Sequence, residues 1–128
     1  MKVNHYQDVE LQPVDMPGSK HCHVRWLVGK SDGAGNFSMR QFEVGVGGHT
    51  PKHSHDYEHE VFVLDGEGTV LENERLHTIK SGDVLFVAPN EIHQFTNTGD
   101  QPLKFLCLIP NSAMDKPIVQ APECGVEP

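Results

Sequence analysis

The stretch His53-Ser54-His55-Asp56-Tyr57-Glu58-His59, followed by the apolar run Val61-Phe62-Val63-Leu64, decides how the rest of the chain is interpreted. In an extended chain alternate side chains share a face, so His53, His55 and His59 can all point the same way. Neutral imidazole binds iron, nickel, copper, zinc and, less tightly, manganese. A lone histidine is far more often a surface or core residue, but three at this spacing predict a metal site.

A fourth histidine, His93, closes the segment Pro89-Asn90-Glu91-Ile92-His93, which has the composition of a turn that leads into a strand. A small β-barrel would bring this position to the same point as the first three. We therefore predict four metal ligands: His53, His55, His59 and His93.

These residues resemble the first motif of the cupin superfamily, in which Gly, His-x-His, a metal-binding Glu and a second Gly follow at set spacings. Gly47 precedes the first histidine by the required five intervening residues, and His59 lies in the slot of the Glu, with six residues between it and Gly66. Glu60 is the competing ligand, but only five residues separate it from Gly66. We interpret His59 as the ligand and Glu60 as its outward-facing neighbour.

The second cupin motif maps onto Gly82, Ala88-Pro89-Asn90, His93 and Asn97. The sequence departs from the motif at Ala88 and at Asn90, where the family has Pro and Gly. Because Asn tolerates the left-handed backbone conformation that Gly supplies, we expect the turn to be kept.

The resemblance covers about residues 23 to 110. It is most specific for small single-domain cupins with four histidine ligands, which bind manganese. It implies an all-β fold, the cupin double-stranded β-helix or jelly-roll β-barrel, that forms a homodimer. It also implies an octahedral divalent transition metal with two neighbouring positions open. Manganese is the metal it favours, with iron, nickel, copper or zinc as alternatives. It implies no particular substrate.

Composition fits one compact domain, since 128 residues can bury a real core. A net charge of −8 argues against nucleic acid and anionic membrane surfaces as partners, because both require basic patches. The N-terminal residues lack the apolar core of an export signal, and the interpretation is a cytoplasmic protein. Three widely spaced cysteines favour reduced thiols.

Short apolar runs separated by turn residues predict an antiparallel barrel. Residues 1–22 are expected to pack on the barrel or a partner, residues 23–110 to form the barrel, and residues 111–128 to form an irregular Pro-rich tail. The predicted strands span 24–29, 37–46, 60–64, 69–72, 76–79, 84–87, 93–96 and 103–109.

Four neutral ligands leave the charge of a divalent ion uncompensated, which favours a small oxygen-bearing or anionic ligand such as a carboxylate, a 2-oxo acid or a diketone. The hypothesis is a metal-dependent enzyme, either an oxygenase or a lyase-like catalyst, with a dioxygenase-like oxidoreductase preferred. The alternative is a non-catalytic module that binds a metal or a small ligand. Structural zinc is less favoured, because such sites usually close as tetrahedra that include Cys.

The pocket walls are inferred from side-chain parity. The resemblance favours Phe105 and Cys107 as inward residues of the last strand, where they are either pocket walls or ordinary core residues, and Phe95 is expected beside them. Arg40 shares a face with apolar residues, so it is either a substrate clamp or an outward residue on a twisted edge, and the clamp is preferred. Tyr57 is either a proton donor or a rim residue. The segment His21-Cys22-His23 looks like a second metal motif but lacks partners.

Overall fold

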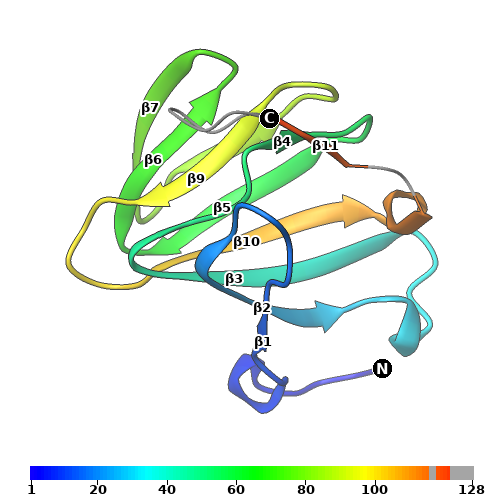
Figure 1. The fold of residues 1–128 in the computed structure, drawn as a ribbon. Coiled ribbons are helices and arrows are strands. Elements are labelled where there is room, and N and C mark those ends of the chain that lie inside the picture. The colour runs from blue at the N-terminus through cyan, green and yellow to red at the C-terminus, as the bar shows by residue number, and fades with distance from the viewer. Residues whose placement is uncertain (116–117, 122–128) are drawn as a thin grey trace.

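The computed structural model describes residues 1–115 and 118–121, and antiparallel strands curl into the jelly-roll barrel that the sequence predicts (Figure 1). The longer strands match the predicted ones to within a few residues. They are β2 (Lys20–Val28), β3 (Phe37–His49), β5 (His59–Asp65), β6 (Glu67–Glu72), β7 (Arg75–Lys80), β8 (Val84–Val87), β9 (His93–Asn97) and β10 (Leu103–Pro110).

Three strands of two residues each complete the sheet, and the sequence analysis did not predict them: β1 (Gln12–Pro13), β4 (His53–Ser54) and β11 (Val119–Gln120). Short 3-10 turns occur at η1 (Tyr6–Asp8), η2 (Lys30–Asp32) and η3 (Asn111–Asp115). None of the helical segments in residues 1–115 and 118–121 is long and apolar enough to cross a membrane.

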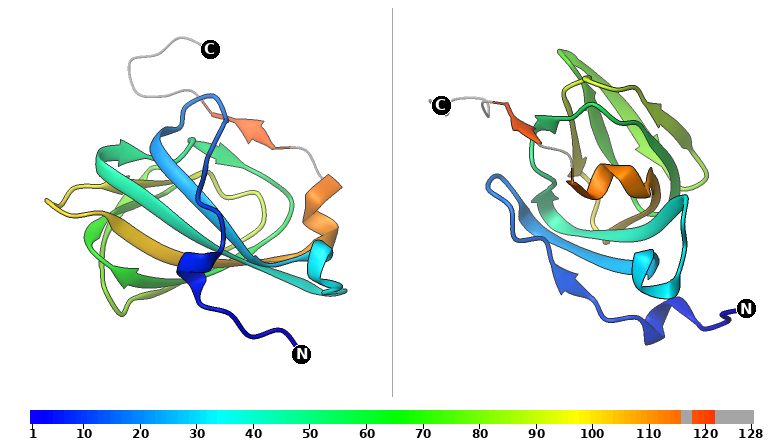
Figure 2. Two further views of the ribbon diagram at one scale, coloured as in Figure 1. Left: turned by 90° about the horizontal axis from the view of Figure 1, so that it is seen from below. Right: turned by 90° about the vertical axis from the view of Figure 1, so that its right-hand side faces the viewer.

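Hydrogen-bonded neighbours run in the order β11-β4-β9-β3-β10-β5-β8; in addition, β2 pairs with β3 and β1 with β2, while β6 pairs with β9 and β7 with β6. Viewed from the side, these strands curve around a common interior (Figure 2). The β4–β9 pairing sets His53 directly opposite His93, so two predicted ligands that are distant in sequence become cross-strand neighbours.

The core forms because strands alternate inward and outward side chains. On β10 every second residue, from Leu103 to Ile109, is buried, as the parity analysis predicted. Phe105 lies opposite Phe42 of β3 and Val63 of β5, and its ring stacks on Phe42 at 5.3 Å and on Phe95 at 4.3 Å between centroids. Burying an aromatic side chain of this size contributes about 1.5–3 kcal/mol, so this stack is a main anchor of the barrel.

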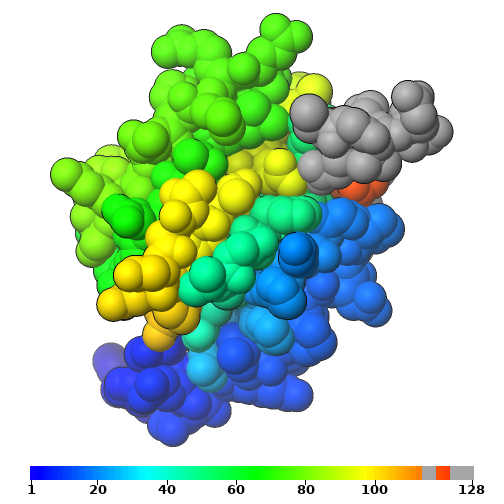
Figure 3. Space-filling view, turned by 60° about the vertical axis from the view of Figure 1, so that its left-hand side comes forward, coloured from blue at the N-terminus to red at the C-terminus, as the bar shows by residue number. Residues whose placement is uncertain are grey.

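Both ends of the described chain pack against the barrel. β2 begins at Lys20, before the expected start of the barrel at residue 23, and β1 pairs with it. In the described part of the predicted tail, β11 follows η3 and pairs with β4, and Ala121 donates its backbone N–H to the Lys52 carbonyl; residues 116–117 and 122–128 of that tail lie outside the described residues. Figures 2 and 3 show the N-terminal loop beside the segment that carries β11.

Candidate metal centre

Four histidines converge inside the barrel, and their ligand nitrogens all lie within 4.8 Å of one another. His53 belongs to β4, His55 follows it, His59 opens β5 and His93 opens β9. The Nε2 atoms of His55 and His59 are only 2.8 Å apart. The chain bends at Asp56 and Tyr57, so His59 reaches the centre from a second strand rather than by the continuous extended run that the sequence suggested.

Each histidine is oriented through its Nδ1 atom. The Nδ1 atoms of His53, His55 and His93 lie 2.8–2.9 Å from backbone carbonyls two residues away in the chain. The Nδ1 atom of His59 lies 3.0 Å from the Sγ atom of Cys107 instead. An Nδ1–H that donates to an acceptor leaves Nε2 without a proton and fixes the ring plane, which is how metal-binding histidines are usually held.

The four imidazoles are neutral at pH 7. Burial lowers the pKa of His55 to about 4 and that of His93 to about 3, and the positive charge of Arg40 acts in the same direction. Burial also lowers the pKa of His53, and it holds that of His59 well below the usual range, with Arg40 again contributing. Neutral imidazole is the metal-binding form.

The donor set fits a divalent transition metal. The Nε2 atom of His93 is buried and has no hydrogen-bond partner among the described residues. Unsatisfied buried polar atoms are rare in native proteins, and a metal ion at this point would satisfy this one. All four nitrogens would hold such an ion, and no Cys belongs to the cluster.

Glu60 does not join the cluster. His59 is buried whereas Glu60 is exposed, which agrees with the interpretation from spacing. The pKa of Glu60 is raised to about 7, mainly by a hydrogen bond with Glu58. The carboxylate that could have replaced the imidazole therefore points away from the barrel interior.

The turn before His93 keeps the geometry that the second motif requires. Asn90 has φ = 69°, the left-handed conformation expected for it. Its N–H donates to the His55 carbonyl at 2.7 Å, and the Glu91 carboxylate accepts from the Ala88 N–H at 2.7 Å. The turn thus links the segments that carry two of the histidines.

A cavity of about 280 Å³ opens onto the four histidines, and its walls are mainly apolar and aromatic. The predicted wall residues Phe95, Phe105 and Cys107 line it. A larger hollow of about 530 Å³ lies between β7 and β8 but meets only His93 of the four, so the smaller cavity is the one that belongs to the centre. The other residues lining the smaller cavity include Val14, Met16, Trp26, Arg40, Phe42, Tyr57 and Ile118.

Arg40 lines the cavity rather than facing outward at a twisted edge, and its role as a substrate clamp stays a prediction. Its guanidinium carbon lies 4.8 Å from the Phe42 ring centroid and 5.4 Å from that of Trp26, and Nη2 donates to Cys107 Sγ at 3.2 Å. Its Nε is buried without a hydrogen-bond partner in the part of the chain that the structure describes. A half-buried cation held by aromatic faces has donors available for an anion.

Tyr57 is half-buried and stacks on the His55 ring at 3.7 Å, with an interplanar angle of 4°. Burial raises its pKa, so its hydroxyl keeps its proton at neutral pH. Tyr57 is therefore a cavity residue rather than only a rim residue.

Several residues that line the cavity were not predicted from the sequence. Trp26 and Phe42 could have been predicted from the alternation of side chains along strands, because Trp26 lies opposite Arg40, and Phe42 lies opposite Phe105. Val14, Met16 and Ile118 carried no signal, since they lie in irregular segments. The segment His21-Cys22-His23 forms no metal group: Cys22 is buried in the core, burial raises its pKa to about 11, and no second cluster occurs among the described residues.

Comparison with known proteins agrees with this geometry. Residues 40–109 match the Cupin_2 family model, described as a cupin domain. A polyketide cyclase, RemF from Streptomyces resistomycificus, has a solved structure with a TM-score of 0.87 at 32% identity, covering 94% of this chain and 85% of that one.

Two curated relatives match shorter stretches. One is 1-methylthio-D-xylulose 5-phosphate methylsulfurylase of Rhodospirillum rubrum, 34% identical over 62% of this chain and 50% of that protein. The other is an oxalate-binding protein of Thermotoga maritima, 41% identical over 44% of this chain and 48% of that protein. The chain spans about half the length of these relatives.

Proposed function

Because this chain belongs to the cupin family, we propose that it is a metal-dependent enzyme that binds an anionic or enolisable oxygen compound at the four-histidine centre. The preferred substrate class is the β-dicarbonyl compounds, and the preferred chemistry is a cyclase- or lyase-type reaction rather than an oxygenation. The observation that carries the proposal is Arg40, a cation directed into the cavity beside four neutral imidazoles.

Charge supports this substrate class. The chain is acidic as a whole, at −8, yet the residues nearest the histidine cluster are neutral imidazoles and the Arg40 guanidinium, and the one carboxylate among the described residues that line the cavity, that of Asp15, is exposed. A divalent ion at the centre would add positive charge that no carboxylate ligand offsets, and it would supply Lewis-acid polarisation of substrate oxygens. An anion or enolate is the complementary ligand.

The chain's own residues have definable roles in such a site. Arg40 would bind a substrate carboxylate or enolate oxygen through its free donors, while Trp26 and Phe42 keep its head group in place. Phe95 and Phe105 form an apolar wall that excludes water and offers a flat surface to a planar substrate. The Tyr57 hydroxyl can donate a hydrogen bond or a proton to a substrate oxygen.

The similarity to the polyketide cyclase supports a substrate with several carbonyl groups, since it extends over most of both chains. A second candidate, a non-catalytic module that binds a small dicarboxylate, has the oxalate-binding relative and the Arg40 geometry in its favour. Dioxygenase-type oxidation stays a prediction that depends on the identity of the metal.

The test is ligand binding to Co²⁺-loaded protein, followed by visible absorption, with acetylacetone and oxalate as probes. We expect acetylacetone to change the spectrum and Arg40→Gln to weaken its binding about tenfold, which corresponds to about 1.4 kcal/mol for a lost charge-assisted hydrogen bond. Arg75→Gln, which removes an exposed cation on β7, is the matched control.

Oxalate binding without acetylacetone binding would favour the binding module. If neither probe binds the wild type, or if Arg40→Gln and Arg75→Gln behave alike, the proposed substrate class is wrong.

A further inference from the structure

A short N-terminal segment, residues 12–16, forms one wall of the metal cavity, and we name it the arm. All five of its residues line the cavity, and Val14 and Met16 are its half-buried members, while Pro13 and Asp15 are exposed. Val14 packs against the buried core cluster. The cavity is therefore only partly enclosed by the barrel itself.

Few backbone bonds attach the arm to the sheet. β1 pairs over two residues, Gln12 opposite Val24 and Pro13 opposite His23, and Val14 donates its N–H to the Cys22 carbonyl at 2.9 Å. Pro13 has no N–H to donate. After the arm, the Ser19 N–H donates to the Met16 carbonyl at 3.1 Å just before β2 begins. A ladder this short contributes little by itself, so what holds the chain before the arm also matters for its position.

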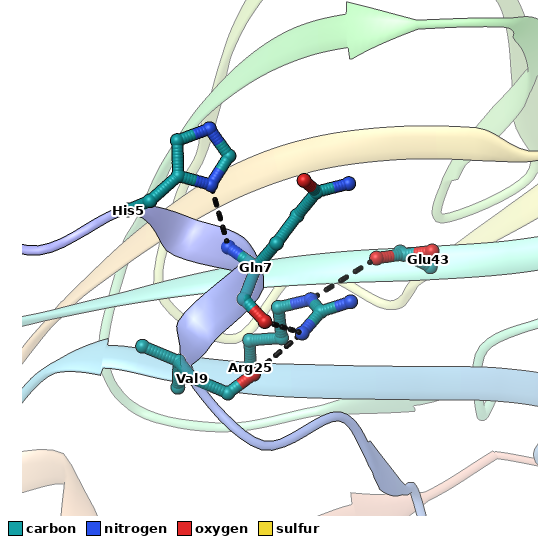
Figure 4. Close-up of polar contacts among 5 residues, drawn as sticks. All are labelled: His5, Gln7, Val9, Arg25 and Glu43. Carbon is teal, nitrogen blue, oxygen red and sulfur yellow. Dashed lines mark hydrogen bonds and ion pairs between the residues drawn. The ribbon is translucent and has the colours of Figure 1, made fainter.

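Arg25 of β2 holds that preceding chain (Figure 4). Its Nη1 donates to the carbonyl oxygens of Gln7 and Val9, while its Nε pairs with the Glu43 carboxylate at 3.3 Å. The guanidinium also lies over the Tyr6 ring, 5.6 Å from its centroid. One half-buried side chain thus joins the segment before the arm to β2 and β3.

The arm lies outside residues 40–109, the part that matches the family model. The four histidines, Arg40, Phe95 and Phe105 lie inside it. Ile118 of the C-terminal segment also lines the cavity. The metal-binding residues of the cavity therefore belong to the family domain, while the arm and Ile118 add walls from the chain segments on either side of that domain.

We propose that the arm determines which ligands the cavity admits: Val14 and Met16 are the specificity-determining side chains, and Arg25 is the positioning residue that keeps them in place. The statement about ligand size rests on the proposed function, whereas the role of Arg25 does not. Met16 is the adaptable part of the wall, because its unbranched side chain has several rotatable bonds. Truncating it leaves the metal-binding end intact and widens the entrance.

The first experiment needs neither metal nor ligand. Trp26, the single tryptophan, is half-buried and lines the same cavity as Val14 and Met16, so we expect its fluorescence to report whether the arm is in place. Arg25→Met keeps the aliphatic stem and removes the donors, and we expect acrylamide quenching of Trp26 to rise about twofold as the arm detaches locally.

Glu43→Gln is the matched control, because it removes the ion pair and leaves both carbonyl contacts available. It should leave quenching at the wild-type level. Unchanged quenching in Arg25→Met, or equal increases in both variants, would show that the two carbonyl contacts do not hold the arm.

The second experiment compares two diketones on Co²⁺-loaded protein: acetylacetone and the bulkier dibenzoylmethane. Met16→Ala should raise the affinity for dibenzoylmethane about tenfold relative to acetylacetone, because the lost side chain gives room for a phenyl ring. Leu76→Ala, at an exposed apolar position on β7, should leave the ratio unchanged.

An unchanged ratio in both Met16→Ala and Val14→Ala overturns the specificity role. If acetylacetone fails to bind the wild-type protein, the proposed function fails instead, and the quenching result still decides whether Arg25 positions the arm.

Discussion

At the scale of single residues, Cys107 differs from the other groups that orient the histidines, because its side chain contacts the Nδ1 atom of His59. The remaining three histidines are oriented by backbone carbonyls, which no substitution can remove. Among the four ligand rings, that of His59 is the one whose Nδ1 atom has a side chain, the Cys107 thiol, as its hydrogen-bond partner. Cys107→Ala should weaken metal binding about tenfold, the usual effect of removing such an orienting partner, and Cys107→Ser should retain most of the affinity. Competition with a chromophoric chelator measures this.

Cys22→Ala is the control for Cys107→Ala, since it also truncates a buried thiol but lies away from the histidines. It should lower stability without changing metal affinity. Equal effects of the two alanine variants on metal affinity would mean that Cys107 does not orient His59.

The identity of the third ligand is a second prediction at this scale. His59→Ala should remove most bound metal, because it deletes a buried nitrogen of the cluster, whereas Glu60→Ala should leave the metal content near the wild-type level, because that carboxylate points outward. Elemental analysis of purified protein gives both values. A larger loss from Glu60→Ala would overturn the four-histidine assignment.

At the scale of elements, the turn before β9 depends on Asn90. With φ = 69°, a side chain without local hydrogen-bonding capacity is strained there, and Asn90→Ala should lower the free energy of unfolding by about 1 kcal/mol. Asn90→Gly should cost less, because Gly adopts this conformation without strain. Urea denaturation distinguishes the two variants, and equal losses would show that the backbone conformation is not what Asn90 supplies.

The longer strands could be predicted because alternating burial leaves a pattern in the sequence, as in Leu103 to Ile109 of β10. The two-residue strands β1, β4 and β11 could not, since they are too short for a pattern and β1 contains a proline. The histidine cluster was predictable from spacing. The arm was not, because Val14 and Met16 become a wall only through contacts with strands far along the chain.

At the scale of the whole molecule, the histidines couple stability to pH. In the unfolded chain each imidazole titrates near pH ~6.5, but burial holds the folded pKa values lower, at about 4 for His55 and about 3 for His93. At pH values between the folded and the unfolded pKa, the unfolded state binds more protons than the folded state. The metal-free protein should therefore lose stability as the pH falls from about 7 toward 4.

Urea denaturation at a series of pH values measures this dependence. Each buried histidine should contribute about 1.4 kcal/mol per pH unit near pH 5, so His59→Gln should show a shallower dependence, while His5→Gln, at an exposed position, should match the wild type. Identical slopes in all three proteins would contradict the buried, neutral state of His59.

The expected homodimer is also a property of the whole molecule. Phe62 of β5 and Val84 and Phe86 of β8 project from the outer face of adjacent strands and are 45%, 73% and 62% exposed. An apolar patch of this kind usually marks an interface, and we propose that a second copy covers it. Phe86→Lys should give a monomer by light scattering, and Leu76→Lys on β7 should not. A monomeric wild type at micromolar concentration would contradict this proposal.

The rigid orientation of the imidazoles by the backbone has a consequence for metal supply in the cell. Because the imidazole rings are already fixed, the site cannot adjust its geometry to favour one metal ion over another. Its metal preference therefore follows the intrinsic order of affinities of the divalent metals, in which manganese binds most weakly and copper most strongly. The ion that such a centre would hold is then set by which metals its surroundings make available. Copies of this protein produced in cells with different metal supplies should therefore carry different ions in the same four-histidine cage.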